Sequence, residues 1–374
     1  IRDTDRSRGL GDVYKRQINK CIMQSQALRN SSQGSVCHKG VYFSMRIGII
    51  GTSAIAGHFV EGARLAGGID IAAVYSRSLE TGEAFAREWK IPIVYTSLDA
   101  LAESTAVDAA YIASPNAFHY SQSKRMLAGG KHVLCEKPIV TAPEQFDELC
   151  AFAAEKGLVY MEAIMMRYLP AREILHKAMG QIGRISAARF DFSQLSSRYP
   201  ALLKGEVPNI FNPAMAAGSL MDLGVYCVYP AIDLFGEPER VRASAGFLST
   251  GADGFGSACL SYPEREVLLS WSKIGQGYAG SEILGDQGSI TIQSISMLAG
   301  MELHLPDGTR RTLCGVLNKA EAMRGETEAF CRFTQEPGRF WLDAARAVEL
   351  TSSVCRVMEQ IRREAGISFG KLPL

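Results

Sequence analysis

One pattern near the start of the chain, between residues 46 and 75, restricts the fold more than any other. Residues 46–50 are mostly apolar and predict a short buried strand. Small residues follow at 51–57, and Ile55, Phe59 and Ala63 then recur at helical spacing. A second apolar run at residues 71–75 predicts another strand. Strand, helix and strand in this order predict a crossover unit and therefore an α/β fold with an open parallel sheet.

The turn after the first strand has a degenerate dinucleotide-binding fingerprint. Gly51 occupies the first glycine position, Ser53 replaces the second glycine and Ala56 stands at the third. In this fingerprint, small residues admit a pyrophosphate to the N-terminus of the helix. A generic crossover without a ligand is the alternative. The turn residues that we expect to bind the cofactor are Gly51, Thr52, Ser53, Ala54 and Ile55.

The second strand ends in Ser76-Arg77 and not in an acidic residue. An Asp or Glu at this position would bind the ribose hydroxyls of NAD. A guanidinium with flanking hydroxyls suits a 2′-phosphate instead. We therefore expect NADP as the cofactor, with Ser76 and Arg77 among its binding residues. NAD remains possible, because Arg77 could also stack on an adenine or lie in solvent.

Composition narrows the classes of function. A chain of 374 residues usually makes two domains. A net charge of +1, with no basic stripe carrying interleaved aromatics, argues against a nucleic-acid surface. We find no run of about 18 apolar residues and expect no membrane span. The nine cysteines have no metal-ligand spacing, so we expect reduced core thiols in a cytoplasmic protein without a metal site.

Residues 1–44 lack the patterning of the rest of the chain. They begin with Ile, are rich in Arg, Ser, Gln and Asn, and carry no sustained periodicity. A secretion signal would need an apolar core of about 7–15 residues, which is not present. We expect a non-native or disordered leader before a native start at Met45.

Polar side chains follow two further predicted strands. The apolar run at 109–113 is followed by Ser114 and Asn116, with His119 just beyond. The run at 132–134 is followed by Glu136 and Lys137. Ligands of open parallel sheets bind beyond the carboxyl ends of the strands, so we expect these side chains beside the cofactor. His119 could instead be a helix cap or a core histidine, and the Glu136–Lys137 pair could be a surface ion pair.

Three segments together resemble the Gfo/Idh/MocA family of NAD(P)-dependent oxidoreductases, which act mainly on sugars, polyols and inositols. They are GTSAIA at 51–56, SPN at 114–116 with His119, and GKHVLCEKP at 130–138. The resemblance covers residues 45–370. It implies a Rossmann domain at 45–165 and an α+β domain at 166–374. It also implies that Lys137 polarises the reacting hydroxyl and that Glu136 and the loop at 114–119 line the cofactor.

The second half is predicted to hold a substrate domain with an open, mainly antiparallel sheet. Alternating strands are expected at 185–192, 241–248, 256–262, 266–272, 280–284, 289–293, 301–305 and 309–313. An uncovered sheet face needs a partner, so we expect a homodimer or homotetramer through this sheet. Helices near 321–334 and 342–364 close the chain, and the last of them could pack back on the first domain.

Two segments before the sheet are candidates for substrate contact. Residues 162–170 resemble a segment of the dihydrodiol, xylose and glucose-fructose branch of the family, in which Arg167 could approach the nicotinamide or the substrate. A surface ion pair is the alternative role for Arg167. Residues 193–213 are polar and irregular. A loop of this length inside a domain is usually functional, and we expect it to border the substrate pocket or an oligomer interface.

Asp222 and Tyr226 are spaced i, i+4 in a predicted helix and would share one face. Most of the family has His at the second position, and the branch named above has Tyr. A phenol can act as a general acid or base if a nearby ammonium, here Lys137, favours the phenolate. Our hypothesis is that Tyr226 exchanges the proton, Lys137 polarises the oxygen and Asp222 positions substrate or lysine. Simple packing of both residues is the alternative.

The sequence therefore predicts hydride transfer between NAD(P) and a carbinol carbon of a sugar, polyol or cyclic diol, with no nucleic-acid or membrane partner. Two alternatives stay open. One is an epimerase, eliminase or glycosidase that holds NAD(H) tightly and uses it transiently. The other is a non-catalytic sensor of dinucleotide and sugar.

Overall fold

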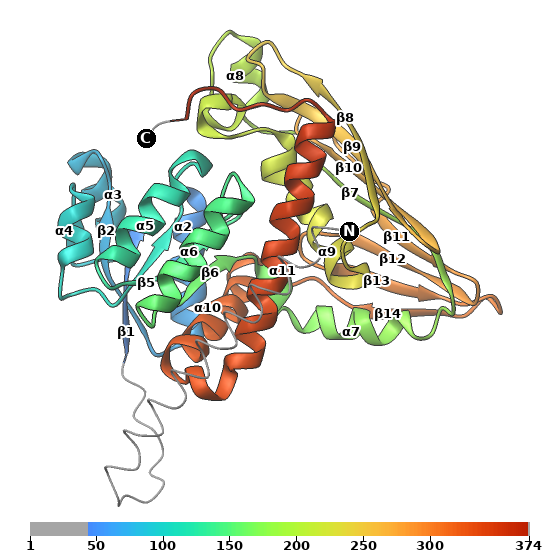
Figure 1. Cartoon of the computed structure of the whole chain (residues 1–374), viewed down its shortest axis with the longest axis horizontal. Coiled ribbons are helices and arrows are strands. Elements are labelled where there is room, and N and C mark those ends of the chain that lie inside the picture. Colours follow the sequence, from blue (N-terminus) through green and yellow to red (C-terminus); the bar gives the residue numbers. More distant parts are fainter. Residues whose placement is uncertain (1–43, 373–374) are drawn as a thin grey trace, which may run out of the picture.

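The computed structural model describes residues 44–372 and contains two sheets, each with its own layer of helices (Figure 1). The predicted leader lies, except for residue 44, outside the described residues. The first sheet has the strand order β3-β2-β1-β4-β5-β6 and is parallel throughout. Its strands are β1 (Met45–Ile50), β2 (Ile69–Tyr75), β3 (Ile93–Tyr95), β4 (Ala109–Ile112), β5 (His132–Glu136) and β6 (Tyr160–Ala163).

Helices cover both faces of this sheet, which is why its strands are apolar and do not alternate. In β1, Ile47 and Ile49 face one core cluster and Ile50 faces the other. The covering helices are α2 (Ala54–Ala66), α3 (Leu79–Trp89), α4 (Leu98–Glu103), α5 (His119–Ala128) and α6 (Pro143–Glu155). The carboxyl ends of β1, β4 and β5 therefore lie at one edge, where the predicted polar residues follow.

The second sheet has eight strands in the order β14-β13-β12-β11-β7-β10-β9-β8 and is antiparallel except between β7 and β10. Alternating burial along β10 and β13 shows that one face packs inward and the other is open. The predicted α/β architecture with an open, mainly antiparallel second sheet is confirmed. The strands are β7 (Ile185–Ser193), β8 (Arg240–Phe247), β9 (Asp253–Tyr262), β10 (Arg265–Ser272), β11 (Ser281–Gly285), β12 (Gly288–Ser294), β13 (Ala299–His304) and β14 (Arg310–Cys314).

Short helical pieces link the two sheets and cover the inner face of the second. The predicted irregular segment at 193–213 contains two of them. The pieces in chain order are η2 (Met165–Tyr168), α7 (Pro170–Met179), α8 (Tyr199–Leu203), η3 (Asn209–Phe211), η4 (Pro213–Met215), a π-helical turn η5 (Leu220–Gly224) and α9 (Val225–Phe235). The helix expected around Asp222 and Tyr226 is present, and its first part, η5, is a π-helical turn that continues directly into α9. Such turns are frequent at functional sites.

The last two helices return to the first domain. They are α10 (Lys319–Gln335) and α11 (Pro337–Glu364), with a kink at Phe340. Helix α10 packs on α2, where a Cβ added to Gly62 would lie 2.9 Å from the Cβ of Met323. Helix α11 runs along the boundary between the sheets (Figure 1). The chain thus crosses between the two halves more than once, and a domain boundary at residue 165 stays a prediction.

One helical stretch, Pro213–Phe235, is apolar enough to span a membrane, with a mean hydropathy of 1.3. However, 83% of that window is buried inside the protein. Its apolar character is explained by packing of α9 against the second sheet.

Candidate active site

The largest cavity lies at the carboxyl edge of the first sheet and has a volume of about 900 Å³. One wall consists of the strand ends and loops of the first domain. The other wall is the segment from Arg198 to Tyr226, which includes the irregular loop expected to border the pocket. The predicted site residues that line it are Ser53, Ile55, Ser114, Asn116, His119, Glu136, Lys137, Asp222 and Tyr226.

The turn after β1 has the geometry that a dinucleotide needs. Gly51 has a φ of 110°, and a Cβ there would lie 2.8 Å from the carbonyl oxygen of Ala113. Ser53 is the N-cap of α2, but its side chain makes no cap hydrogen bond. The first N–H groups of α2 therefore have no side-chain partner at the cap and point toward the cavity edge, where a helix N-terminus favours an anion. The residues present fit a bound dinucleotide.

The end of β2 lies farther along this edge. The Ser76 hydroxyl accepts a hydrogen bond from the backbone N–H of Ser78. The exposed Arg77 guanidinium lies 5.8 Å from the centre of the Phe118 ring. Arg77 does not line the main cavity, and within residues 44–372 its guanidinium forms no ion pair with a carboxylate.

Asn116 and His119 are more constrained than the sequence predicted. The Asn116 amide donates to the carbonyl oxygen of Ala216 at 3.0 Å and to Oδ1 of Asp222 at 3.2 Å. Both ring nitrogens of His119 lie 2.8 Å from carbonyl oxygens, Nδ1 from Pro138 and Nε2 from Ser114. Both side chains line the cavity as expected, but these polar atoms already have partners in the protein, and their contact with a cofactor stays a prediction. Asn116 ties the two domains together, and His119 ties two loops of the first domain.

Ser114 and Glu136 are also engaged within the protein. The Ser114 hydroxyl donates to Oε1 of Gln122 at 2.6 Å. Glu136 is buried, and its Oε1 accepts from the Tyr111 hydroxyl at 2.6 Å. Burial raises the pKa of Glu136, although the neighbouring Lys137 opposes the shift. The Glu136 carboxyl is therefore a fixed polar group in the cavity wall and not part of a surface ion pair.

Lys137 projects from the end of β5 to the second domain. Its Nζ donates to the main-chain carbonyl oxygen of Asp222 at 3.0 Å and lies 4.7 Å from the centre of the Tyr226 ring. Burial lowers the pKa of Lys137, and the nearby cations Lys319 and Lys273 add to this effect. An ammonium with a lowered pKa can both donate a hydrogen bond and exchange a proton.

The Asp222 carboxylate is held by a residue that the sequence reasoning missed. The Lys273 ammonium forms an ion pair with Oδ2 of Asp222 and donates to the carbonyl oxygen of Ile210 at 2.8 Å. Lys273 is buried, with 4% of its surface exposed. Its only sequence signal is that it follows strand β10 directly. Asp222 is therefore fixed in place before any substrate arrives.

Tyr226 lies in the cavity wall but is not poised as a phenolate. Its ring packs edge-on against Phe192, with centroids 5.4 Å apart. Burial raises the pKa of Tyr226 well above its usual value, and the carboxylates of Glu136 and Glu326 add to the shift. Burial therefore favours the protonated phenol, which can donate a hydrogen bond. The predicted role of Tyr226 in proton exchange with Lys137 stays a prediction.

Arg167 lies away from the cavity. It lines a separate hollow with Arg172 and Asp233, on the side of α9 that faces α11. Its guanidinium lies 5.8 Å from the centre of the Tyr168 ring. Arg167 is therefore not among the residues that line the main cavity, and its predicted approach to the substrate has no support in this arrangement.

No group of three His, Cys, Asp or Glu side chains within residues 44–372 is arranged to hold a metal ion. The chemistry available at the cavity is therefore that of a lysine, a phenol and a fixed carboxylate beside a dinucleotide-binding turn.

Comparison with known proteins agrees with this geometry. Residues 45–164 match a family described as "Oxidoreductase family, NAD-binding Rossmann fold", and residues 168–291 match the GFO/IDH/MocA C-terminal domain. The chain is 37% identical to the scyllo-inositol 2-dehydrogenase (NADP(+)) IolU of Bacillus subtilis and 36% identical to the uncharacterized oxidoreductase YgjR of Escherichia coli. Both alignments cover 87% of this chain and 98% of the relative.

A more distant relative is the trans-1,2-dihydrobenzene-1,2-diol dehydrogenase of Mus musculus, 34% identical over 59% of this chain and 66% of that protein. Among solved structures, KijD10, a 3-ketoreductase from Actinomadura kijaniata crystallised with NADP and TDP-benzene, superposes with a TM-score of 0.75. It shares 22% identity, and the match covers 86% of this chain and 98% of that one. At this identity the likeness concerns the fold alone.

Proposed function

Because the chain belongs to the Gfo/Idh/MocA oxidoreductase family, we propose that it is an NADP-dependent dehydrogenase acting on the CH–OH group of a polyol or cyclic diol. One observation carries the proposal. Lys137 from the first domain and Asp222 and Tyr226 from the second converge in a single cavity beside the dinucleotide turn. The substrates of the related inositol and dihydrodiol dehydrogenases support the substrate class.

The cofactor, when bound, accepts or supplies the hydride, and the protein manages the proton. In the oxidation direction, the hydroxyl proton of the substrate passes to the neutral amine of Lys137, whose pKa is lowered by burial. In the reduction direction, Lys137 and the protonated Tyr226 donate hydrogen bonds to the carbonyl oxygen. The carboxylate of Asp222 is fixed by Lys273 and Asn116. The main-chain carbonyl oxygen of the same residue accepts the hydrogen bond that orients Lys137.

NADP is proposed over NAD because β2 ends in Ser76-Arg77 and lacks an acidic residue there. An unpaired guanidinium at that place suits a 2′-phosphate. NADP is also the cofactor named for the related scyllo-inositol 2-dehydrogenase of Bacillus subtilis.

Absorbance of the reduced nicotinamide tests the proposal directly. The full chain is assayed with NADP and NAD separately against inositols, aldoses and cyclic diols, with Lys137→Ala as control. Reduction that depends on Lys137 would support a dehydrogenase. If cofactor stayed bound through purification without net reduction, the transient-redox alternative would hold. If the protein had no affinity for either dinucleotide, the enzyme assignment would fail.

We also propose a homodimer or homotetramer through the open sheet, in a cytoplasmic protein. Phe255 and Leu268 are about half exposed, at 50% and 47%, on the face of β9 and β10 that no helix covers. The seven cysteines within residues 44–372 are all free thiols, which fits a reducing compartment. Sedimentation of the wild type and of Leu268→Asp tests the assembly, since a charge on this face should shift the protein toward monomer.

A further inference from the structure

Two cations of the second domain, Lys319 and Arg198, line the main cavity. Lys319 is the first residue of α10, and Arg198 directly precedes α8; both are exposed and both line the cavity. Within residues 44–372, neither side chain has a hydrogen-bond or ion-pair partner in the protein. Among the cavity residues they therefore stand out as charged groups with free donors.

The carboxylates that line the cavity do not neutralise the positive charges of Lys319 and Arg198. The Asp222 carboxylate is paired with Lys273. The Glu136 carboxyl accepts from Tyr111, and its burial raises its pKa. The remaining carboxylate in the lining is the exposed Glu206, on the rim of the loop. The cavity interior thus keeps an excess of positive charge that a bound anion would neutralise.

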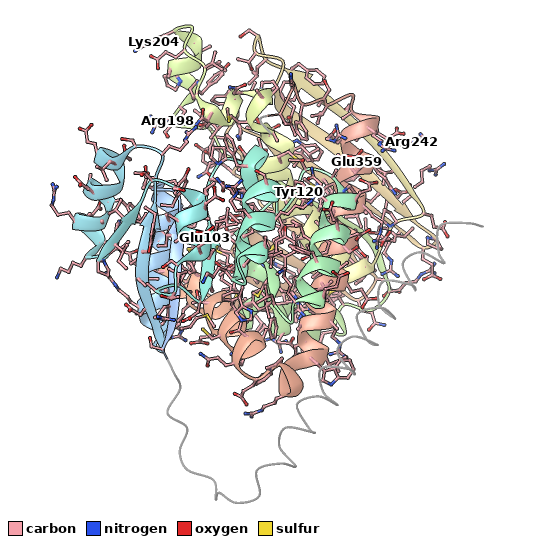
Figure 2. All side chains as sticks on the ribbon, turned by 60° about the vertical axis from the view of Figure 1, so that its left-hand side comes forward. Glu103, Tyr120, Arg198, Lys204, Arg242 and Glu359 are labelled. Carbon is pink, nitrogen blue, oxygen red and sulfur yellow. The ribbon has the colours of Figure 1, made fainter. Side chains whose placement is uncertain are left out.

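The two cations approach the cavity from different sides. A capping box between Asn318 and Glu321 holds the start of α10, so Lys319 is anchored beside α2. Its charge is close enough to Glu136 and Lys137 to influence the pKa of both. Arg198 lies on the side of the α8 segment that faces the first domain (Figure 2). A ligand in the cavity would therefore meet one cation beside α8 and another at the start of α10.

We propose that Lys319 and Arg198 are anion-binding residues through which the second domain binds phosphate or carboxylate oxygens of the ligands in this cavity. The inference rests on the proposed function, because the cavity is taken to hold a dinucleotide and its substrate. The anionic oxygens could belong to the cofactor or to an acidic substrate. In either case the ligand links the two domains, whereas the turn at Gly51 engages it from the first domain alone.

The first arm of the test measures binding of NADPH without substrate, by calorimetry at several salt concentrations. Lys319→Met and Arg198→Met should each raise the Kd about tenfold and flatten its salt dependence, as expected when one charge-assisted contact is lost. Lys177→Met, an exposed lysine on α7 away from the cavity, should leave the Kd unchanged. Lys319→Arg should restore binding. Since both side chains are exposed, these variants should keep the wild-type thermal unfolding temperature.

The second arm distinguishes the source of the anion. If the Kd for NADPH were unchanged but KM rose for a carboxylated polyol and not for its neutral counterpart, the residues would bind substrate. If binding and both KM values matched the wild type, the inference would be overturned while the proposed function stood. If the wild type bound no dinucleotide, the proposed function would fail, and this inference with it.

Discussion

The ammonium of Lys137 lies over the face of the Tyr226 ring, 4.7 Å from its centre, and donates its hydrogen bond to the main-chain carbonyl of Asp222. A cation in this place is attracted by the ring quadrupole and does not stabilise a phenolate oxygen. Together with burial, this arrangement leaves Tyr226 as a protonated donor. In the mechanism that we propose, the proton acceptor during alcohol oxidation is therefore Lys137.

Tyr226→Phe removes the hydroxyl but keeps the ring that packs against Phe192 and Lys137. We expect kcat for carbonyl reduction to fall about 100-fold, the lower end of the usual loss when one hydrogen-bond donor to the developing oxyanion is removed. The Kd for NADPH should not change. Steady-state kinetics and calorimetry check the two values, and full turnover in the variant would exclude a role for the hydroxyl.

Lys137 should control the pH dependence of alcohol oxidation. Its folded-state pKa is lowered from the usual 10.5 by burial, so the reactive neutral amine forms at a lower pH than in free lysine. The value of kcat/KM should therefore rise with pH and level off below pH 10.5. Lys137→Ala should lose most of the activity, and the kcat/KM that remains should not rise with pH in this range. A rising limb that persisted in the variant would assign the titration to another group.

Lys273→Met leaves the Asp222 carboxylate without its cation. Breaking a buried pair from one side commonly costs about 3 kcal/mol, so we expect a loss of that order in the free energy of unfolding. Urea titration measures it, with Lys177→Met as the matched control. The double change Lys273→Met with Asp222→Asn should recover part of the stability, since no unpaired charge remains. Equal stability of the single variant and the wild type would show that the pair contributes nothing.

Arg77→Ala tests the choice of cofactor. Loss of a charge-assisted contact to a 2′-phosphate should raise KM for NADP about tenfold or more and leave KM for NAD nearly unchanged. Arg87→Ala, on the exposed side of α3, is the control. A similar effect on both dinucleotides would indicate that Arg77 contacts a part that they share.

Asp233 should contribute a stability that acid removes. Burial alone would raise its pKa, but hydrogen bonds from His176 and Arg172 outweigh this and hold it at about 2, against 3.8 unfolded. Because the pKa of Asp233 is lower in the folded state, its carboxylate stabilises the fold fully above pH 3.8. This stabilisation is lost as the pH falls through 2. The shift corresponds to about 2 kcal/mol. Asp233→Asn should therefore lower stability at pH 7 and weaken the acid dependence in denaturant titrations.

The sequence by itself determined the elements and their order. Apolar runs and turn residues predicted four of the six parallel strands, at 46–50, 71–75, 109–113 and 132–134, and the eight strands of the open sheet. They could do so because the spacing of apolar residues along neighbouring positions indicates a strand or a helix. It also predicted that Lys137 and the other polar strand ends would share one edge, since parallel strands end on the same side of a sheet.

Only the tertiary structure decided how those groups are used. Lys273 and Asp222 are 51 positions apart and pair across two elements, which no local pattern encodes. Lys319 reaches the cavity because α10 returns to pack on α2. The amide of Asn116 donates to the carbonyl oxygen of Ala216, 100 positions away, and Nδ1 of His119 lies against the carbonyl oxygen of Pro138, 19 positions away. Such contacts depend on the relative placement of whole elements, and a shift of one helical turn would rearrange all of them.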